Sequence, residues 1–224
     1  MDMIKRIIKS KIYVIISVLI FIILLCFAVR IFSSNSLSKE EKAAIHLNLA
    51  SIYELRGEID KSIVEINKAI EIFPEYDLAY SLLGDNYYRV GNLNKSLESY
   101  QEAVKIKEDP EYYFDIANVY YAQGELGEAQ KYYLKVIELD SNATNAYLNI
   151  ANILLDANKV LESKIYYDRV LEIEPYNSNA HNDLGYYYET IGDFDKAKEE
   201  YALALEIDPE NTFARSNLEN LVNQ

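Results

Sequence analysis

The chain has 224 residues, with 36 acidic side chains against 22 Lys and Arg, and a formal net charge of −14. Five of the basic side chains and one acid lie in residues 1–36, so residues 37–224 carry a net charge of −18. A region this acidic repels phosphate backbones, which argues against a nucleic-acid partner. It is either a solubilising surface or one that recognises a basic partner. The single cysteine, Cys26, excludes an intramolecular disulfide.

The N-terminal region contains an uncharged apolar run, residues 12–29. As a helix it is about 27 Å long, close to the thickness of a bilayer core. Arg30 can extend its guanidinium towards the headgroups, which lets Ile31 and Phe32 lengthen the apolar run. The sequence therefore predicts a basic N-terminal segment at 1–11, a transmembrane helix at 12–32 and a short linker at 33–38.

Charges on the two sides of this run predict its orientation. Lys5, Arg6, Lys9, Lys11 and the terminal amine precede it, whereas Arg30, Lys39 and Lys42 follow it. The positive-inside rule then places the N-terminus in the cytoplasm and the rest of the chain on the exoplasmic side. Abundant Ile, Asn, Lys and Tyr indicate an AT-rich genome, so we expect a bacterial plasma membrane. The margin is small, and a cytoplasm-facing arrangement stays open.

A cleaved signal peptide is the alternative reading of the same run. Its apolar core is longer than signal peptides use, and Arg30 interrupts the region where a cleavage site belongs. Leu25 stands before Cys26, where lipoprotein signals need a small residue. The sequence thus favours an uncleaved signal anchor.

One pattern recurs five times after this segment, at intervals of 34, 33, 34 and 34 residues. The period is clearest at one turn position, occupied by Gly57, Gly91, Gly124, Asn158 and Gly192. A fixed period of this length indicates stacked structural repeats. The array is expected at 39–211, with units 43–76, 77–109, 110–143, 144–177 and 178–211. Residues 212–224 restart the pattern and predict a capping helix, in which Phe213, Leu218 and Leu221 cover the last unit.

Each unit carries two apolar stripes of helical period, at positions 4, 7, 8 and 11 and at positions 20, 24 and 27. Small residues at positions 8 and 20 let two helices approach closely. Position 8 holds Ala50, Gly84, Ala117, Ala151 and Gly185; position 24 holds Ile66, Tyr100, Tyr133, Tyr167 and Tyr201. Two stripes joined by a turn that needs a left-handed residue predict an antiparallel helix pair. Ser38 with Glu41 predicts a capping box, and Asp109-Pro110 predicts a helix start.

These positions resemble the tetratricopeptide repeat (TPR) family, most closely from Leu184-Gly185 through Tyr188, Gly192, Ala197, Tyr201, Ala204 and Pro209. The resemblance implies an all-α fold, a right-handed superhelical solenoid of antiparallel helix pairs. It also implies a protein-interaction scaffold rather than an enzyme. With the N-terminal segment, the chain resembles a membrane-anchored TPR protein.

Residues that could perform chemistry are few. His46 and His181 both occupy position 4, where other units have Tyr, so a packing role is expected. No catalytic, cofactor-binding or metal-ligating constellation is present in the sequence. We expect no enzyme activity, no cofactor and no metal.

The family resemblance implies a concave groove lined by the first helix of each pair, with ligand contacts from positions 2, 5, 9, 12 and 13. The candidate groove residues are Tyr88, Arg89, Phe114, Asn118, Tyr121, Leu148, Asn152 and Tyr186. Their aromatic and amide side chains suit a segment of another protein. Ordinary exposed apolar residues are the alternative reading. Arg89 is the one basic residue among these positions, which argues against the sub-type that grips a C-terminal carboxylate.

The expected function is a membrane-anchored scaffold or adaptor that binds another protein in its groove. Envelope assembly, secretion or chaperone-like holding are settings consistent with the family. A self-associating structural protein is an alternative, for which Tyr112, Tyr132, Tyr166 and Tyr187 would supply exposed contacts in a homo-oligomer. An adaptor resembling an import receptor, facing the cytoplasm, is another.

Overall fold

The computed structural model describes residues 37–223, which are all-α. These residues form eleven helices and no strand. None of these helices is long and apolar enough to cross a membrane. The expected basic segment, the transmembrane helix and linker residues 33–36 lie outside the described residues. The helices are α2 (Lys39–Leu55), α3 (Ile59–Ile72), α4 (Asp77–Arg89), α5 (Leu93–Ile106), α6 (Pro110–Ala122), α7 (Leu126–Leu139), α8 (Thr144–Asp156), α9 (Val160–Ile173), α10 (Ser178–Thr190), α11 (Phe194–Ile207) and α12 (Thr212–Val222).

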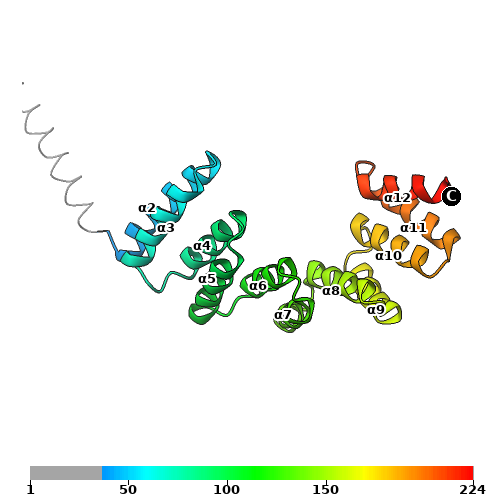
Figure 1. Cartoon of the computed structure of the whole chain (residues 1–224), viewed down its shortest axis with the longest axis horizontal. Coiled ribbons are helices and arrows are strands. Elements are labelled where there is room, and N and C mark those ends of the chain that lie inside the picture. Colours follow the sequence, from blue (N-terminus) through cyan, green and yellow to red (C-terminus); the bar gives the residue numbers. More distant parts are fainter. Residues whose placement is uncertain (1–36, 224) are drawn as a thin grey trace, which may run out of the picture. The chain divides into compact units, whose positions relative to one another are not determined.

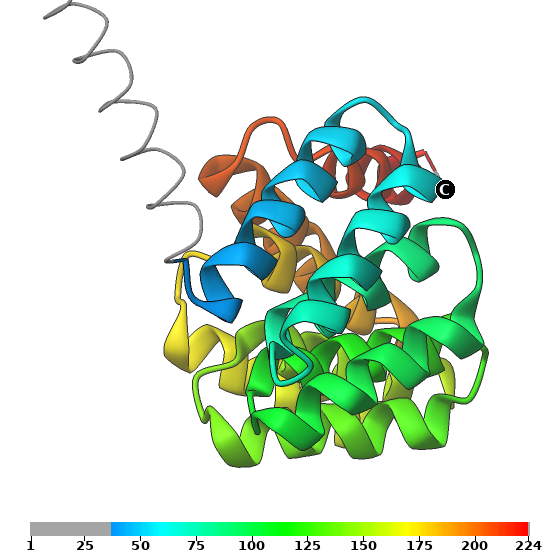
Figure 2. The same cartoon turned by 90° about the vertical axis from the view of Figure 1, so that its left-hand side faces the viewer.

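The chain divides into two compact units, the first ending at Tyr76 and the second beginning at Asp77. In the first unit α2 and α3 form one antiparallel pair, drawn in blue and cyan in Figure 2. In the second unit the pairs α4–α5, α6–α7, α8–α9 and α10–α11 follow one another, and α12 packs on the last pair (Figure 1). The second unit thus forms a solenoid of helical hairpins.

Local sequence signals set the helix ends. Ser38 and Glu41 make the capping box at the start of α2, with the Ser38 amide donating to Glu41 at 2.7 Å. Asp109 caps α6 and Pro110 begins it. The turn within each pair holds a residue of positive φ, and Asn158, at φ 59°, takes the place that Gly has in the other four. Asn tolerates this left-handed conformation better than other side chains do, which explains its presence there.

The core of each pair forms where a position 24 side chain meets position 8 of the first helix. Tyr133, Tyr167 and Tyr201 are almost fully buried there. Gly84 and Gly185 give the space that their tyrosines need, because a Cβ added at Gly185 would lie 2.6 Å from the Tyr201 ring. Pairs also bury apolar residues against their neighbours, so the core continues along the second unit.

Two expectations about exposed and buried aromatic residues are wrong. Tyr112 and Tyr187 are buried, with 6% and 3% of their surface exposed, so they cannot supply a self-association surface. They stand at positions 3 and 10, one stripe of the first helix, and that stripe packs against the preceding pair. Tyr132 and Tyr166 are half-buried, and their rings contact Tyr120 and Tyr147.

The capping helix is also only partly as expected. Leu221 is buried and Leu218 packs against the last pair, but Phe213 is 73% exposed. Phe213 stands at position 2 of the restarted pattern, in the register of Asn145 and Asn179. These three residues face the same cleft, so Phe213 belongs to that surface rather than to the core.

Candidate functional site

A repeated hydrogen bond connects the core to the inner face of the first helices. Tyr133 donates its hydroxyl to Oδ1 of Asn118 at 2.6 Å, and Tyr167 donates to Oδ1 of Asn152 at 2.5 Å. In the preceding pair Tyr100 donates to Asp85 at 2.6 Å. Because the tyrosine hydroxyl bonds the amide oxygen, the NH2 group of each asparagine remains a donor for another acceptor, as Nδ2 of Asn152 is for Asp183.

A cleft of about 440 Å³ opens on this face of the second unit. It runs across the first helices α6, α8 and α10 and reaches α12. We call it the amide cleft, because five of its nine lining residues are asparagines. It is lined by Phe114, Asn145, Leu148, Asn149, Asn152, Asn179, Asn182, Asp183 and Phe213. Such a surface combines hydrogen-bond donors and acceptors with aromatic contact area at its two ends.

A second cleft of about 360 Å³ shares residues with the first. It carries two half-exposed tyrosines, and we call it the tyrosine cleft. It is lined by Tyr121, Asn152, Leu155, Asp156, Asn182, Asp183, Tyr186 and Asn217. The two clefts have Asn152, Asn182 and Asp183 in common, so they form one continuous surface on the first helices.

Carboxylates on this face are held in an unfavourable environment. Burial raises the pKa of Asp115 on α6 to about 7, and the negative charges of Asp85 and Glu111 add to the rise. Burial also raises the pKa of Asp183 above its usual range, although hydrogen bonds from Asn152 and Asn182 oppose the rise. Perturbed carboxylates beside a cleft mark a candidate functional site.

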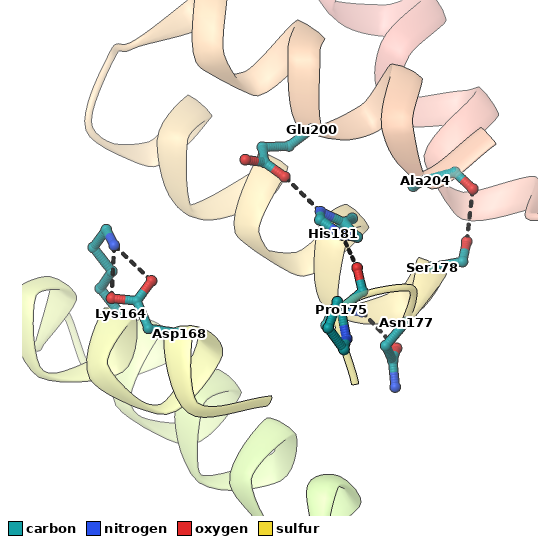
Figure 3. Close-up of polar contacts among 9 residues, drawn as sticks. Lys164, Asp168, Pro175, Asn177, Ser178, His181, Glu200 and Ala204 are labelled. Carbon is teal, nitrogen blue, oxygen red and sulfur yellow. Dashed lines mark hydrogen bonds and ion pairs between the residues drawn. The ribbon is translucent and has the colours of Figure 1, made fainter. Parts of the chain in front are cut away.

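The two histidines have structural partners. Nδ1 of His181 lies 2.7 Å from Glu200 and its Nε2 lies 3.1 Å from the carbonyl of Pro175 (Figure 3). His46 pairs with Glu65 at the same separation along the chain. Two of the three units that have Tyr at this position place another ring 19 residues later, Tyr113 with Tyr132 and Tyr147 with Tyr166. The histidines therefore replace a packing contact, as expected. The described residues contain no group of side chains suited to hold a metal ion.

Family models for the tetratricopeptide repeat match residues 41–109, 110–143, 144–177 and 178–211. The chain belongs to the tetratricopeptide repeat family. A TPR repeat-containing protein of Methanocaldococcus jannaschii is 31% identical over 112 residues, which are 50% of this chain and 20% of that protein. The chain thus spans about a fifth of the length of this relative.

Solved TPR structures share the fold at low sequence identity. A TPR protein from Parabacteroides merdae superposes with a TM-score of 0.72 at 14% identity, covering 81% of this chain and 72% of that one. PilF of Pseudomonas aeruginosa gives 0.68 at 16% identity, with coverages of 82% and 90%. YrrB, described as a TPR protein with an unusual peptide-binding site, gives 0.61 at 20% identity, with coverages of 78% and 90%.

Six of the residues expected in a TPR groove fall on this surface or beside it. Phe114, Leu148 and Asn152 line the amide cleft, and Tyr121 and Tyr186 line the tyrosine cleft together with Asn152. Asn118 on α6 accepts a hydrogen bond from Tyr133 on α7 and lies beside the clefts. Tyr88 and Arg89 are exposed at the end of α4 and line neither cleft.

Other residues of the surface had not been selected from the sequence. Asn145, Asn179 and Phe213 stand at position 2, which the family resemblance names as a contact position, so that position alone could have identified them. Asn149 and Asp183 stand at position 6, which gives no such signal. Asn217 belongs to α12, where a capping helix was expected rather than a groove wall.

Proposed function

We propose that this TPR protein is an adaptor that holds a segment of another protein along the first helices of its second unit. The observation that carries the proposal is the amide cleft, a groove of asparagine side chains between Phe114 and Phe213. An extended segment has backbone N–H and C=O groups free for such amides, and the two rings suit apolar side chains at either end.

Two further facts support a protein ligand. Tyrosines in the core fix the amides of Asn118 and Asn152, so little side-chain freedom is lost when a ligand binds. YrrB, whose fold is similar, is described as having a peptide-binding site, although its low identity supports the fold alone.

Membrane anchoring is the second part of the proposal. The predicted transmembrane helix at 12–32 would hold the array close to one face of a membrane, because the expected linker is only six residues long. Anchoring raises the effective concentration of the groove for partners in the same membrane. Envelope assembly, secretion and chaperone-like holding are the settings that we propose for such an adaptor.

Photo-crosslinking at matched phenylalanines tests the groove. p-Benzoylphenylalanine is placed at Phe213, which lines the amide cleft, or at Phe194, which is 49% exposed on the outer helix α11. Both substitutions add the same benzoyl group to a phenylalanine, and both side chains are exposed enough to accept it. We expect irradiation of intact cells to give one discrete product with another protein at position 213 and not at position 194.

Mass spectrometry of that product identifies the segment held, and a synthetic copy of the segment should compete with the crosslink. Equal products from the two positions would overturn the groove assignment. Products that contain only this chain would replace the adaptor with the self-associating alternative.

The orientation has its own test. Leu161, 81% exposed on α9, is changed to Cys in a chain whose Cys26 is Ser. A membrane-impermeant maleimide should label intact spheroplasts if the array faces the exoplasmic side. Labelling only after lysis would support the cytoplasm-facing adaptor instead, and release of the chain by alkaline carbonate would exclude the anchor.

A further inference from the structure

Asp183 is the end point of a hydrogen-bond network that four helices build beneath the tyrosine cleft. Nδ2 of Asn182 donates to Oδ1 of Asp183 at 3.1 Å, and Nδ2 of Asn152 donates to Oδ2 at 3.3 Å. Asn217 on α12 donates to Oδ1 of Asn182 at 3.0 Å, and Tyr167 on α9 donates to Asn152. Both chains of donors run towards the carboxylate, which fixes its position and favours its charge.

The network leaves acceptor capacity on Asp183. A carboxylate offers about four lone-pair sites, and each oxygen of Asp183 receives one amide hydrogen in these contacts. Asp156, which is exposed on α8, lines the same cleft. The cleft therefore presents two carboxylates, one of them rigidly held.

Within the described residues, the three helices that form the clefts supply no Lys or Arg to balance these charges. Helices α6, α8 and α10 contain no Lys and no Arg, and the residues lining the tyrosine cleft include neither. The second helices α7 and α9, in contrast, hold their lysines in ion pairs with acids of the same helix, such as Lys164 with Asp168 at 2.6 Å. The positive charge that suits Asp183 must come from outside these helices.

Two tyrosines complete the site. Tyr121 on α6 is 46% exposed and Tyr186 on α10 is 50% exposed, and both line the cleft that holds Asp183. The faces of aromatic rings attract cations, and a guanidinium can stack on a ring while it donates to a carboxylate. Carboxylates, amide oxygens and exposed rings together are complementary to a basic side chain rather than to an acidic or apolar one.

We propose that the tyrosine cleft binds an Arg or Lys side chain of the protein segment held along the groove, with Asp183 as its main acceptor and Asp156 as a second one. This inference rests on the proposed function, because it names the chemistry of the segment. The raised pKa of Asp183 agrees with it, since a buried carboxylate gains most from a cationic partner.

A peptide array with matched sequences tests the proposal. Random twelve-residue peptides are synthesised in four versions that differ at one central residue, which is Arg, Lys, citrulline or Glu. The full-length chain in mild detergent is applied to the array, and the affinity of retained peptides is then measured by fluorescence anisotropy. Citrulline has the shape of Arg without its charge, so it separates charge from contact area.

We expect Arg and Lys versions to bind about tenfold more tightly than citrulline versions, and Glu versions to bind least. Asp183→Asn should abolish the preference, and Asp156→Asn should weaken it. Asp195→Asn, which removes an identical charge from the exposed first turn of α11, should keep it. This control accounts for non-specific attraction to an acidic protein, and circular dichroism melting curves confirm that each variant is folded.

Binding without a preference for Arg or Lys would overturn the inference and leave the groove function standing. A preference that survives in both cleft variants would overturn it as well. An array with no retained peptide would also overturn it, and the crosslink at position 213 then decides separately whether the groove function holds.

Discussion

The first helices of the second unit and the second helices behind them carry their charges in different ways. On the outer helices each of several acids has a base one turn away, as in Lys131 with Glu128 and Arg169 with Glu172. The inner helices α6, α8 and α10 have acids but no Lys or Arg, and burial raises the pKa of both Asp115 and Asp183.

An acidic protein can gain solubility from any exposed carboxylate, but half-buried carboxylates without a base reduce stability. The outer helices therefore fit a solubilising surface, whereas the inner helices fit a surface kept for binding. Functional sites commonly reduce the stability of the fold in this way. Substitutions matched between the two sets of helices test this contrast.

The largest change in stability is expected at a glycine of the inner helix α10. Gly185→Ala on α10 would place a Cβ 2.6 Å from the buried ring of Tyr201, so the ring must move within a packed core. We expect a loss of about 2–3 kcal/mol in the free energy of unfolding.

Gly127→Ala on the outer helix α7 is the control, since a Cβ there meets nothing within 4 Å. It should raise stability by about 0.5 kcal/mol. Urea unfolding followed by circular dichroism measures both, and equal effects would contradict the close packing at Gly185.

A smaller change in stability, a gain rather than a loss, is expected from Asp115→Asn. Its pKa is raised to about 7 in the folded protein and is near its usual value when unfolded, so the folded state binds the extra proton. Its contribution to stability is present below about pH 4 and is lost as pH rises through about 7. Asp115→Asn removes that loss. We expect a gain of about 1–2 kcal/mol above pH 7, once the partial exposure of the carboxylate is allowed for, and no gain near pH 4.

Asp168→Asn is the matched change on an outer helix. It breaks the ion pair with Lys164 and should lower stability slightly at neutral pH. Thermal melts from pH 4 to pH 8 compare the two variants. A gain for Asp115→Asn that does not depend on pH would refute the electrostatic cause.

The parts of the fold that could be predicted from the sequence are those that repeat within each unit. The stripe at positions 4, 7, 8 and 11, the turn glycines and Asn158 are visible in each unit separately, and the structure has them as expected. The stripe at positions 3 and 10 was missed, because its partners belong to the preceding pair. Tyr112 and Tyr187 therefore looked exposed when they are buried.

The lining of the clefts could be predicted only in part, because some of its contacts join different units. Phe114, Leu148 and Asn152 follow from the register of the first helix. The environment of Asp183 depends on side chains 31 and 35 residues apart, Asn152 with Asp183 and Asn182 with Asn217. No single unit contains such a network, so repetition of the sequence pattern cannot reveal it.

The smallest change in stability is expected from a variant that tests whether a core tyrosine positions an amide of the groove. Tyr167→Phe removes the hydroxyl that donates to Asn152 and leaves the ring in place. The loss of one hydrogen bond should cost about 1 kcal/mol of stability. It also frees the amide of Asn152 to rotate, which weakens its bond to Asp183. Peptide affinity should therefore fall by more than the stability loss explains, and the preference for Arg peptides should be reduced.

Tyr166→Phe, one residue earlier, is the control, because its ring packs against Tyr147 outside both clefts. If the two variants bind the array peptides equally well, the tyrosine only fills the core and does not position the amide.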